Sequence, residues 1–328
     1  MSTKEAVLQL LQRAQGDLSG EQLSQQLGLS RAAVWKAVRA LRAEGYDIAA
    51  GTNRGYRLLS QPDVLTREAV AEALAGHPWA QRVTVCQSVD STNRMARQLA
   101  AQGAPSGTCV IADRQTAGRG RRGRSFYSPP GEGLYMSVVL RPRALPEEIM
   151  NLTALVAVGA CDAVEAVCGE RPGIKWTNDL VFGTKKLAGI LTELSVIAET
   201  REVEYVVVGI GVNCAQTQFP EDIRDVATSI WLHTGRRVAR ARLAAALLRA
   251  FARLDAQLPG GCAEDMARFR AGCVTLGKRV TILRGDSSRE AFAEDVAPDG
   301  ALIVRYDDGT QEHIASGEVS VRGLYGYV

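Results

Sequence analysis

The sequence predicts an α+β protein in three parts, because its pattern changes twice along 328 residues. Residues 1–62 show helices, a glycine turn and a hairpin, which is typical of a winged helix-turn-helix domain. Residues 63–270 alternate buried strands with amphipathic helices, which favours a mixed sheet backed by helices. Residues 271–328 show short strands separated by Gly/Asp turns, and we expect a small SH3-like β-barrel there.

The composition is that of an ordinary globular chain, with 46% hydrophobic and 23% charged residues. The charged, helical start does not resemble a signal peptide, and no apolar run approaches the roughly 20 residues that cross a bilayer. The seven cysteines are scattered and the three histidines are distant, which predicts reduced, mostly buried thiols and no metal cluster. We therefore expect a cytoplasmic protein without a membrane partner.

The N-terminal part begins with a helix whose apolar face includes Val7 and Leu11 and which ends before Gly16. A second short helix ends at Leu27, Gly28 makes the turn, and Ser30 is a suitable N-cap for the third helix. The stretch YDIAAGTNRGYRLL then predicts a two-stranded wing.

The third helix places its polar residues away from the apolar face of Val34, Val38 and Leu41. The excess of positive charge in the whole chain lies within residues 1–62, which favours a polyanionic partner. We predict DNA binding through the major groove and the wing, and the alternative is a protein-interaction module. The residues expected to contact DNA are Ser30, Arg31, Ala32, Trp35, Lys36, Arg39 and Arg54.

The central part follows a linker at 60–66 and opens with a short strand, VTVC, and a helix capped by the cluster Asp90-Ser91-Thr92. The strands GTCVIAD and GLYMSVVLRP flank an arginine-rich loop, and a long apolar helix is predicted over 147–168. IKWTNDLVFGTKKLAGILTEL predicts a strand pair around a Gly-Thr-Lys-Lys turn. EYVVVGIGVN is another buried strand, and helices return around 240–270.

The arginine-rich loop QTAGRGRRGRSF contains a literal G-x-G-x-x-G at Gly118, Gly120 and Gly123. It is not a Rossmann phosphate loop, because RSFYSPPGEG follows and no helix begins there. A solvated basic run is the other ordinary interpretation. Arg114 just before the loop and the four arginines within it, among several glycines, cannot bury themselves, so we expect a mobile segment that orders around an anion such as a phosphorylated ligand.

Several stretches together resemble the biotin–protein ligase family in order and spacing: DSTN at 90–93, QTAGRGRRGRSF at 115–126, KWTNDL at 175–180, KKLAGILTEL at 185–194 and GIGVN at 209–213. With the N-terminal winged helix and the C-terminal strands, the whole chain is similar to the bifunctional bacterial form. The resemblance implies a biotin–lipoate ligase-type catalytic domain over 63–270, between a DNA-binding domain over 1–62 and a C-terminal domain over 271–328.

The implied activity has two steps. Biotin and ATP, with Mg²⁺, form biotinyl-5′-AMP and pyrophosphate, and a lysine of a biotin carboxyl carrier protein then takes the biotin. The implied catalytic residues are Arg119, Arg121 and Lys186. The implied biotin-binding residues are Ser91, Thr92, Asn93, Gln115, Arg119, Gly120, Arg121, Lys186 and Gly189. The implied ATP- and adenylate-binding residues are Arg121, Arg122, Arg124, Phe126, Asn178, Asp179, Asn213 and Arg322.

Two positions depart from the family pattern, which usually has proline at Thr177 and often tryptophan at Phe126. The resemblance also implies an operator-binding repressor with biotinyl-5′-AMP as corepressor and a homodimer promoted by that ligand. Two alternatives stay open at this point. One is a lipoate-type acyl-adenylating ligase, and the other is a non-catalytic transcription factor that senses biotin.

Overall fold

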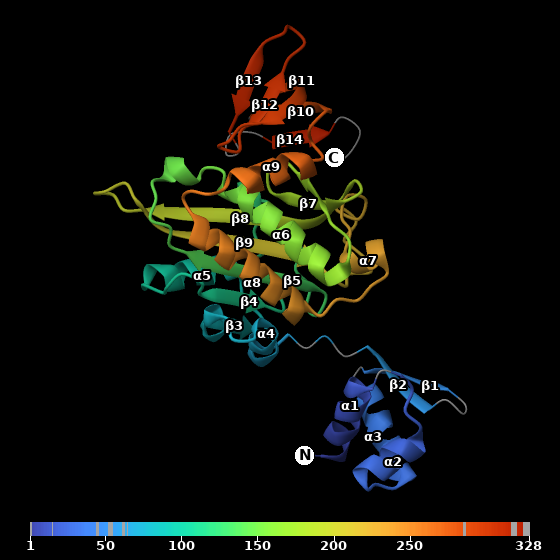
Figure 1. Cartoon of the computed structure of the whole chain (residues 1–328). Helices are drawn as coiled ribbons and strands as arrows, with labels where there is room; N and C mark the ends of the chain where they lie inside the picture. Colours follow the sequence, from blue (N-terminus) through green and yellow to red (C-terminus); the bar gives the residue numbers. More distant parts are fainter. Residues whose placement is uncertain are drawn as a thin grey trace. The chain divides into compact units, whose positions relative to one another are not determined.

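The structure is a computed structural model that describes residues 2–14, 16–43, 46–51, 55–60, 63, 65–284, 287–315 and 320–323, with backbone only at 59, 60 and 320–323. Contacts divide the chain into two compact units, Met1–Asp63 and Val64–Val328. The division falls inside the linker predicted at 60–66. Figure 1 shows the elements of both units in chain order.

The N-terminal unit is a three-helix domain with a two-stranded antiparallel hairpin. Gly28 adopts a left-handed conformation with φ 64°, which a glycine accepts without strain and which turns the chain between the second and third helices. The Ser30 side chain accepts a hydrogen bond from Ala33 N, so the predicted N-cap is confirmed. The elements are α1 Thr3–Arg13, α2 Gly20–Leu27, α3 Arg31–Ala43, β1 Asp47–Gly51 and β2 Gly55–Ser60.

The second unit contains a seven-stranded sheet in the order β3-β4-β5-β9-β8-β7-β6. Strands β3 and β4 are parallel and the other pairs are antiparallel, so the predicted mixed sheet is confirmed. The strands are β3 Val83–Cys86, β4 Cys109–Ala112, β5 Gly133–Leu140, β6 Gly173–Lys175, β7 Asp179–Phe182, β8 Lys185–Val196 and β9 Val203–Asn213.

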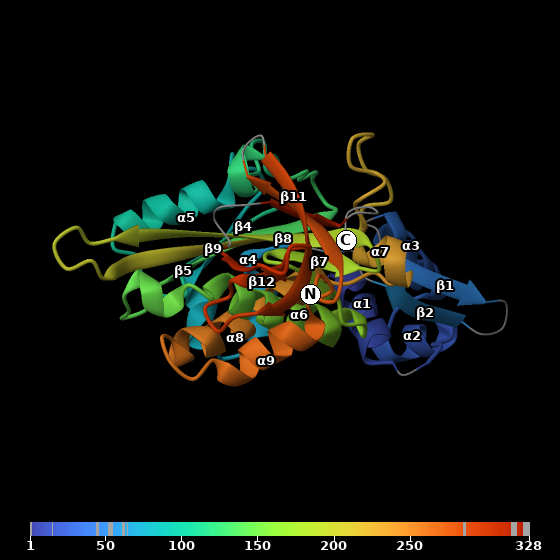
Figure 2. The same cartoon turned by 90° about the horizontal axis from the view of Figure 1, so that it is seen from above.

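Helices cover both faces of this sheet, as Figure 2 shows with α5 on one side and α6, α8 and α9 on the other. The helices are α4 Arg67–Leu74, α5 Thr92–Ala101, α6 Leu152–Cys168, α7 Ile230–Thr234, α8 Arg240–Gln257 and α9 Ala263–Gly272. Short 3₁₀ turns lie at Pro78–Arg82, Arg121–Gly123 and Pro146–Ile149.

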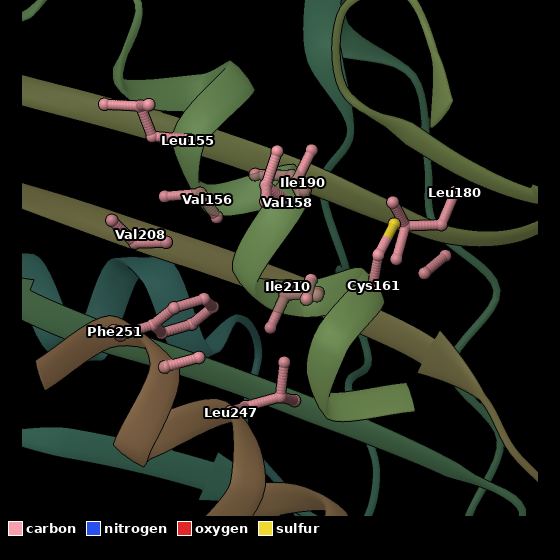
Figure 3. Packing of buried hydrophobic residues seen from close by; sticks show 14 of the residues in the cluster. Leu155, Val156, Val158, Cys161, Leu180, Ile190, Val208, Ile210, Leu247 and Phe251 are labelled. Carbon is pink, nitrogen blue, oxygen red and sulfur yellow. The ribbon is translucent and has the colours of Figure 1, made fainter. Parts of the chain in front are cut away.

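The main core lies between the sheet and the α6–α8 pair, where Val156, Ile210 and Phe251 pack together (Figure 3). Helix α6 is buried on several sides, which explains why it is apolar around most of its circumference. By length and composition, Pro146–Cys168 could cross a membrane, contrary to our expectation from the sequence. Its most apolar window is 61% buried inside the protein, as in the core helix of a globular domain.

Two local predictions in the central part are wrong. The helix predicted from 147 begins at Leu152, because Pro146 starts a separate 3₁₀ turn and the Asn151 side chain donates to the carbonyl of Pro298 in the C-terminal part. The cluster Asp90-Ser91-Thr92 does not cap α5 through the Ser91 hydroxyl. Instead the Asp90 carboxylate accepts from the Ser91 backbone N–H at 2.5 Å.

The C-terminal part is a five-stranded antiparallel sheet in the order β13-β12-β11-β10-β14. Turns at 299–300 and 308–309 join strands as predicted, while the turn predicted at 285–286 lies outside the described residues. Closure of this sheet into a barrel stays a prediction. The strands are β10 Arg279–Arg284, β11 Ser287–Val296, β12 Leu302–Arg305, β13 Gln311–Ile314 and β14 Ser320–Gly323.

All seven cysteines are free thiols, six of them buried and Cys86 partly buried. Burial raises the pKa of the Cys161 thiol to about 12 and raises the pKa of Cys109 further, so these thiols stay protonated at neutral pH. The prediction of reduced, mostly buried cysteines is confirmed.

Candidate active site

The floor of the site is the sheet face opposite α6 and α8. Because side chains alternate along a strand, the core residues Val208 and Ile210 on β9 leave Gly209 and Gly211 facing the other way. Gly189 on β8 pairs with Gly211, and Ser137 on β5 pairs with Gly209. Strands β8 and β9 therefore present bare backbone at Gly189, Gly209 and Gly211, beside Ser137 of β5, which lets other groups lie flat against the sheet.

A group of polar side chains borders this floor at the N-terminus of α5. We call Thr92, Asn93, Gln115, Ser128 and Ser137 the polar corner. Gln115 Oε1 accepts from the Thr92 backbone N–H at 2.9 Å and lies 3.1 Å from the Thr92 hydroxyl, while Gln115 Nε2 donates to Ser128 Oγ at 3.1 Å. The Ser137 hydroxyl lies 2.8 Å from Thr92 Oγ1 and 2.6 Å from Asn93 Oδ1.

Asn93 is bound on every side by the protein itself. Its amide nitrogen donates to the carbonyl of Leu191 and to the carboxylate of Glu193, and its oxygen faces Ser137. A Cβ atom at Gly209 would overlap the Asn93 amide, so only glycine leaves room for this side chain. Asn93 therefore ties α5 to the sheet and has no donor left for a ligand.

Ser91 directly precedes α5 and is 2% exposed. Within the described part of the chain, its hydroxyl has no hydrogen bond that caps the helix. The polar corner thus brings Thr92 and Gln115 together, and Ser91 directly precedes Thr92 in the chain. Ser128 and Ser137 belong to the same corner, and sequence reasoning missed them because isolated serines carry no pattern.

The arginine-rich loop folds into a small turn of its own. Gly120 N donates to Arg124 O at 2.7 Å, and Phe126 N donates to Gly118 O at 2.9 Å. Gly118 is required there, because a Cβ would lie 2.7 Å from the Phe126 carbonyl oxygen. The side chains of Arg119, Arg122 and Arg124 are exposed, so the loop presents cations to solvent while its backbone is internally bonded.

Arg121 is the arginine of this loop that turns toward the sheet. Its guanidinium donates to Asn178 Oδ1 at 3.1 Å. Burial lowers the pKa of Arg121 below its usual value, the nearby carboxylate of Asp179 opposes that change, and Arg122 and Arg124 add to it. Arginine stays protonated in proteins, so Arg121 places a cation in a partly dehydrated position, where its charge acts strongly on a bound anion.

Lys186 forms the second cationic point. Its ammonium lies 2.7 Å from the Asp179 carboxylate, and the Lys186 side chain is 28% exposed. The Asn178 amide nitrogen donates to the carbonyl of Ile190, so the turn before β7 is bonded directly to β8. Arg121, Lys186, Asn178 and Asp179 therefore form one cluster, which we call the charged cluster.

Phe126 lies on the glycine floor beside the charged cluster. A Cβ at Gly211 would lie 2.5 Å from the ring and a Cβ at Gly189 would lie 3.4 Å from it. The ring also meets Tyr135 edge-on at 6.3 Å, and Lys186 Nζ lies 6.0 Å from its centre. Any ligand that lies against Gly189 and Gly211 must displace this ring or stack on it.

The turn with Thr177 is held from the C-terminal part. The Trp176 indole N–H donates to the carbonyl of Gly300 at 3.0 Å, and Trp176 N donates to Thr275 Oγ1 at 2.9 Å. Thr177 itself is 2% exposed. These bonds position the turn although proline is absent. No local pattern indicates these bonds, because the partners are about 100 or more residues away.

Asn213 lies at the end of β9, where its amide donates to the carbonyl of Thr228 at 2.9 Å and its oxygen accepts from Gln216 at 3.2 Å. It holds the segment that follows β9 in place. Arg322 lies on β14 opposite Thr281, but its side chain is outside the described residues. Its implied contact with ATP is therefore not visible.

A cavity of about 620 Å³ lies beside this site, between the β7–β8 hairpin, α7 and the segment after β9. Its lining includes Phe182, Lys185, Phe219, Arg224 and His233, and none of the predicted site residues. Within the described residues, no group of three or more His, Cys, Asp or Glu side chains could hold a metal ion.

In the N-terminal unit, α3 buries Val34, Val38 and Leu41 and leaves Trp35, Lys36 and the predicted residues at 30–32 and 39 partly or fully exposed. The Trp35 side chain is 55% exposed, and the Arg39 guanidinium lies 5.4 Å from its ring centre. Arg54 lies outside the described residues. Arg57, on strand β2 of the wing, forms an ion pair with Asp17 at 2.7 Å.

Three family descriptions match the chain. "HTH domain" matches residues 3–57, "Biotin/lipoate A/B protein ligase family" matches 85–213, and "Biotin protein ligase C terminal domain" matches 275–322. Among solved structures, the biotin protein ligase from Aquifex aeolicus in complex with biotin and ATP is similar, with a TM-score of 0.63 and 29% identity. The similarity covers 74% of this chain and 98% of that one.

Two curated relatives combine these parts under the name bifunctional ligase/repressor BirA. The protein of Bacillus subtilis is 39% identical over 236 residues, which cover 71% of this chain and 72% of the relative. The protein of Escherichia coli is 31% identical over 305 residues, which cover 93% and 92%. This chain therefore belongs to the biotin–protein ligase family, and within it to the bifunctional ligase/repressors that carry an N-terminal helix-turn-helix domain.

Proposed function

We propose that this protein activates biotin with ATP to biotinyl-5′-AMP, transfers biotin to a lysine of a biotin carboxyl carrier protein, and represses transcription with the adenylate as corepressor. The observation that carries the proposal is the meeting of the charged cluster and the polar corner on one glycine floor. A neutral, hydrogen-bonding ring and an anionic tail need these two environments side by side.

The polar corner supplies the binding site for the ureido ring of biotin. The ring carries two N–H donors and one carbonyl acceptor, so its site must offer both acceptors and donors. Ser91, Thr92 and Gln115 lie together and offer two hydroxyls and an amide. Asn93 acts there as a positioning residue, because the protein already uses its hydrogen-bonding groups.

The charged cluster brings two anions together. In the first step, an oxygen of the biotin carboxylate bonds to the α-phosphorus of ATP, the bond to the bridging oxygen breaks, and pyrophosphate leaves. Arg121 and Lys186 reduce the repulsion between the carboxylate and the phosphates, and electrostatic stabilisation of this kind is usually the largest catalytic contribution. In this structure, Arg121 donates to the Asn178 side-chain oxygen and Lys186 pairs with the Asp179 carboxylate. A bound anion would replace these two acceptors.

Mg²⁺ fits this site as an ion carried by ATP. Magnesium usually uses one or two protein oxygens together with phosphates and waters. Asp179 and the Asn178 side-chain oxygen are acceptors of the right chemistry beside the cationic pair. When bound, the ion neutralises phosphate charge, and these two residues are the ones that would hold it.

In the second step, the uncharged amine of the acceptor lysine attacks the carbonyl carbon of the mixed anhydride, and AMP leaves with the bridging oxygen. No serine, cysteine or histidine nucleophile is required, because the adenylate is already the activated acyl donor. The enzyme must exclude water until the acceptor arrives. We propose that Arg119, Arg122 and Arg124, which are exposed on the loop, close over the adenylate phosphate and that Phe126 stacks on adenine.

The repressor function follows from the N-terminal unit. Exposed Trp35, Lys36 and Arg39 on α3 fit a helix that enters the major groove, with Ser30, Arg31 and Ala32 at its start. We propose Arg54, which lies outside the described residues, as a further DNA contact. We propose that the adenylate orders loops bordering a homodimer surface, so that two such units bind a two-fold operator together. We propose that the protein works in the cytoplasm, without a membrane partner.

Two assays test the two activities. Biotin-dependent exchange of labelled pyrophosphate into ATP should be observed with the full chain, and lipoate should not replace biotin. Exchange with lipoate alone would favour a lipoate-type ligase, and no exchange with either acid would favour a non-catalytic sensor. In sedimentation equilibrium, biotinyl-5′-AMP should shift the protein toward dimer, and an unchanged monomer fraction would reject the corepressor scheme.

A further inference from the structure

Ser137 is a buried hydroxyl inside the site that neither the sequence pattern nor the proposed chemistry assigns. It lies in the middle of β5 with no exposed surface, on the same sheet face as the glycine floor. Its oxygen lies 2.8 Å from Thr92 Oγ1 and 2.6 Å from Asn93 Oδ1. A serine on a fully buried strand is costly unless its hydrogen bonds are made, so these two contacts define its role.

The orientation of the two amides follows from neighbouring groups that can only donate, at Gln115, or only accept, at Asn93. The Thr92 backbone N–H approaches the Gln115 amide at 2.9 Å, so the atom facing Thr92 must be the amide oxygen. The Asn93 nitrogen approaches the carbonyl of Leu191 and the carboxylate of Glu193, so the Asn93 oxygen must face Ser137. Both ends of the chain Asn93–Ser137–Thr92–Gln115 are therefore acceptors.

This chain of four oxygens is short of one hydrogen. It has three contacts, of 2.6, 2.8 and 3.1 Å, and only the two hydroxyls of Ser137 and Thr92 contribute hydrogens. Hydroxyl hydrogens settle in the shorter contacts, where two oxygens without a hydrogen would repel most strongly. Ser137 then donates to Asn93, Thr92 donates to Ser137, and the longest contact, between Thr92 and Gln115, holds none.

This arrangement determines the direction in which the Thr92 hydroxyl points its hydrogen. Its only hydrogen points inward to Ser137, so its remaining lone pairs point toward Gln115 and the ligand side of the corner. We infer that Ser137 is a positioning residue that makes Thr92 a hydrogen-bond acceptor for a ligand N–H group, and so contributes to selection of the ureido ring. This inference rests on the proposed biotin ligase function and extends it to a residue that does not itself touch the ligand.

The experiment pairs a change in the protein with a change in the ligand. Ser137→Ala removes the inward acceptor of the Thr92 hydroxyl, so its hydrogen can turn toward a ligand acceptor, including the ring oxygen of a carbamate. The probes are biotin and the two cyclic carbamates in which one ureido N–H is replaced by oxygen. Dissociation constants are measured by calorimetry on the full chain without ATP. We expect the wild type to prefer biotin over one carbamate by at least about tenfold, and Ser137→Ala to bring that ratio close to one.

A purely structural role gives a different result. If Ser137→Ala weakens biotin and both carbamates by the same factor, or leaves the preference unchanged, the inference is wrong. Ser137→Thr keeps a hydroxyl and should keep the preference, and Ser195→Ala, which removes a partly exposed serine near the end of β8, is the matched control. Should Ser137→Ala fail to fold, Ser137→Cys, nearly isosteric with a much weaker donor, takes its place.

Failure of the proposed function is distinguishable from failure of this inference. A wild type that neither binds biotin nor supports biotin-dependent pyrophosphate exchange contradicts the ligase function itself. A wild type that does both, with a preference that survives in Ser137→Ala, contradicts only the role of Ser137.

Discussion

The polar corner and the arginine-rich loop lie on the same floor but are built in opposite ways. In the polar corner, Thr92, Asn93 and Ser137 are almost completely buried and are bonded to one another or to the sheet. In the loop, three of the arginines at 119–124 expose their side chains, and Arg121 alone in that stretch bonds to the turn before β7 among the described contacts. The polar corner is therefore preorganised, whereas the arrangement of the arginine-rich loop depends on what it binds.

The physical reason is the kind of group each half must recognise. A neutral ureido ring is recognised by the direction of its hydrogen bonds, and direction needs side chains held in single rotamers. Anionic phosphates are recognised mainly by charge, and several guanidinium groups on one glycine-rich loop would repel one another if they were packed together without an anion.

The largest effect is expected at Gly209, under the polar corner. Gly209→Ala places a methyl group on the Asn93 amide, so Asn93 must move and α5 with it. We expect a loss of about 3 kcal/mol in the free energy of unfolding. Biotin affinity should fall by about a hundredfold or more, as expected for a misplaced site. Urea denaturation and calorimetry measure the two effects, and Gly260→Ala, which has open space around it, is the matched control.

A large effect on binding without an effect on folding is expected at Arg121. Arg121→Ala and Lys186→Ala should each weaken biotinyl-5′-AMP binding by about 2–4 kcal/mol, because each removes a charged contact in a closed site. Thermal unfolding in the absence of ligand should change little. Arg253→Ala, an exposed arginine of α8, serves as the control. Unchanged adenylate affinity in both variants would contradict the assignment of the charged cluster.

Ionic strength should weaken ligand binding at the charged groups more than ligand binding in the polar corner. Raising salt from low to high concentration should weaken adenylate binding on the order of fivefold, because partly exposed guanidinium groups are screened. The binding of desthiobiotin methyl ester, which keeps the ureido ring and lacks the carboxylate, should change much less, because it depends on hydrogen bonds in the polar corner. Titrations at several salt concentrations measure both. Equal salt dependence of the two ligands would remove the contrast between the halves.

An effect of similar size is expected at the link to the C-terminal part. Trp176→Phe removes the hydrogen bond to the Gly300 carbonyl and leaves an aromatic ring in place. The turn that carries Asn178 should loosen, which would raise the KM for ATP about fivefold, equivalent to about 1 kcal/mol. The KM for biotin should stay the same. A parallel rise in both values in pyrophosphate exchange would show that the turn does not serve the nucleotide half specifically.

Much of the fold could be predicted from local pattern. Apolar spacing identified α3 and its buried residues Val34, Val38 and Leu41, and the glycine at 28 correctly marked the turn before it. Alternation and length identified β5, β8 and β9. The start of α6 was missed because Asn151 bonds to Pro298, and no local pattern carries a contact between residues 147 positions apart.

The site divides along the same line. The motifs that resemble the ligase family were enough to predict a set of site residues, because residue type and order can be read from the chain alone. These residues are Arg121, Lys186, Asn178, Asp179, Thr92 and Gln115. Three features of the site appear only in the folded protein. The Asn93 amide nitrogen is already hydrogen-bonded to Leu191 and Glu193, and Ser137 completes the polar corner. Gly209 and Gly211 must be glycine because other side chains lie against them. Those facts depend on strands and helices that meet across about 100 residues of sequence, where packing and the direction of hydrogen bonds, rather than local propensity, determine each residue's role.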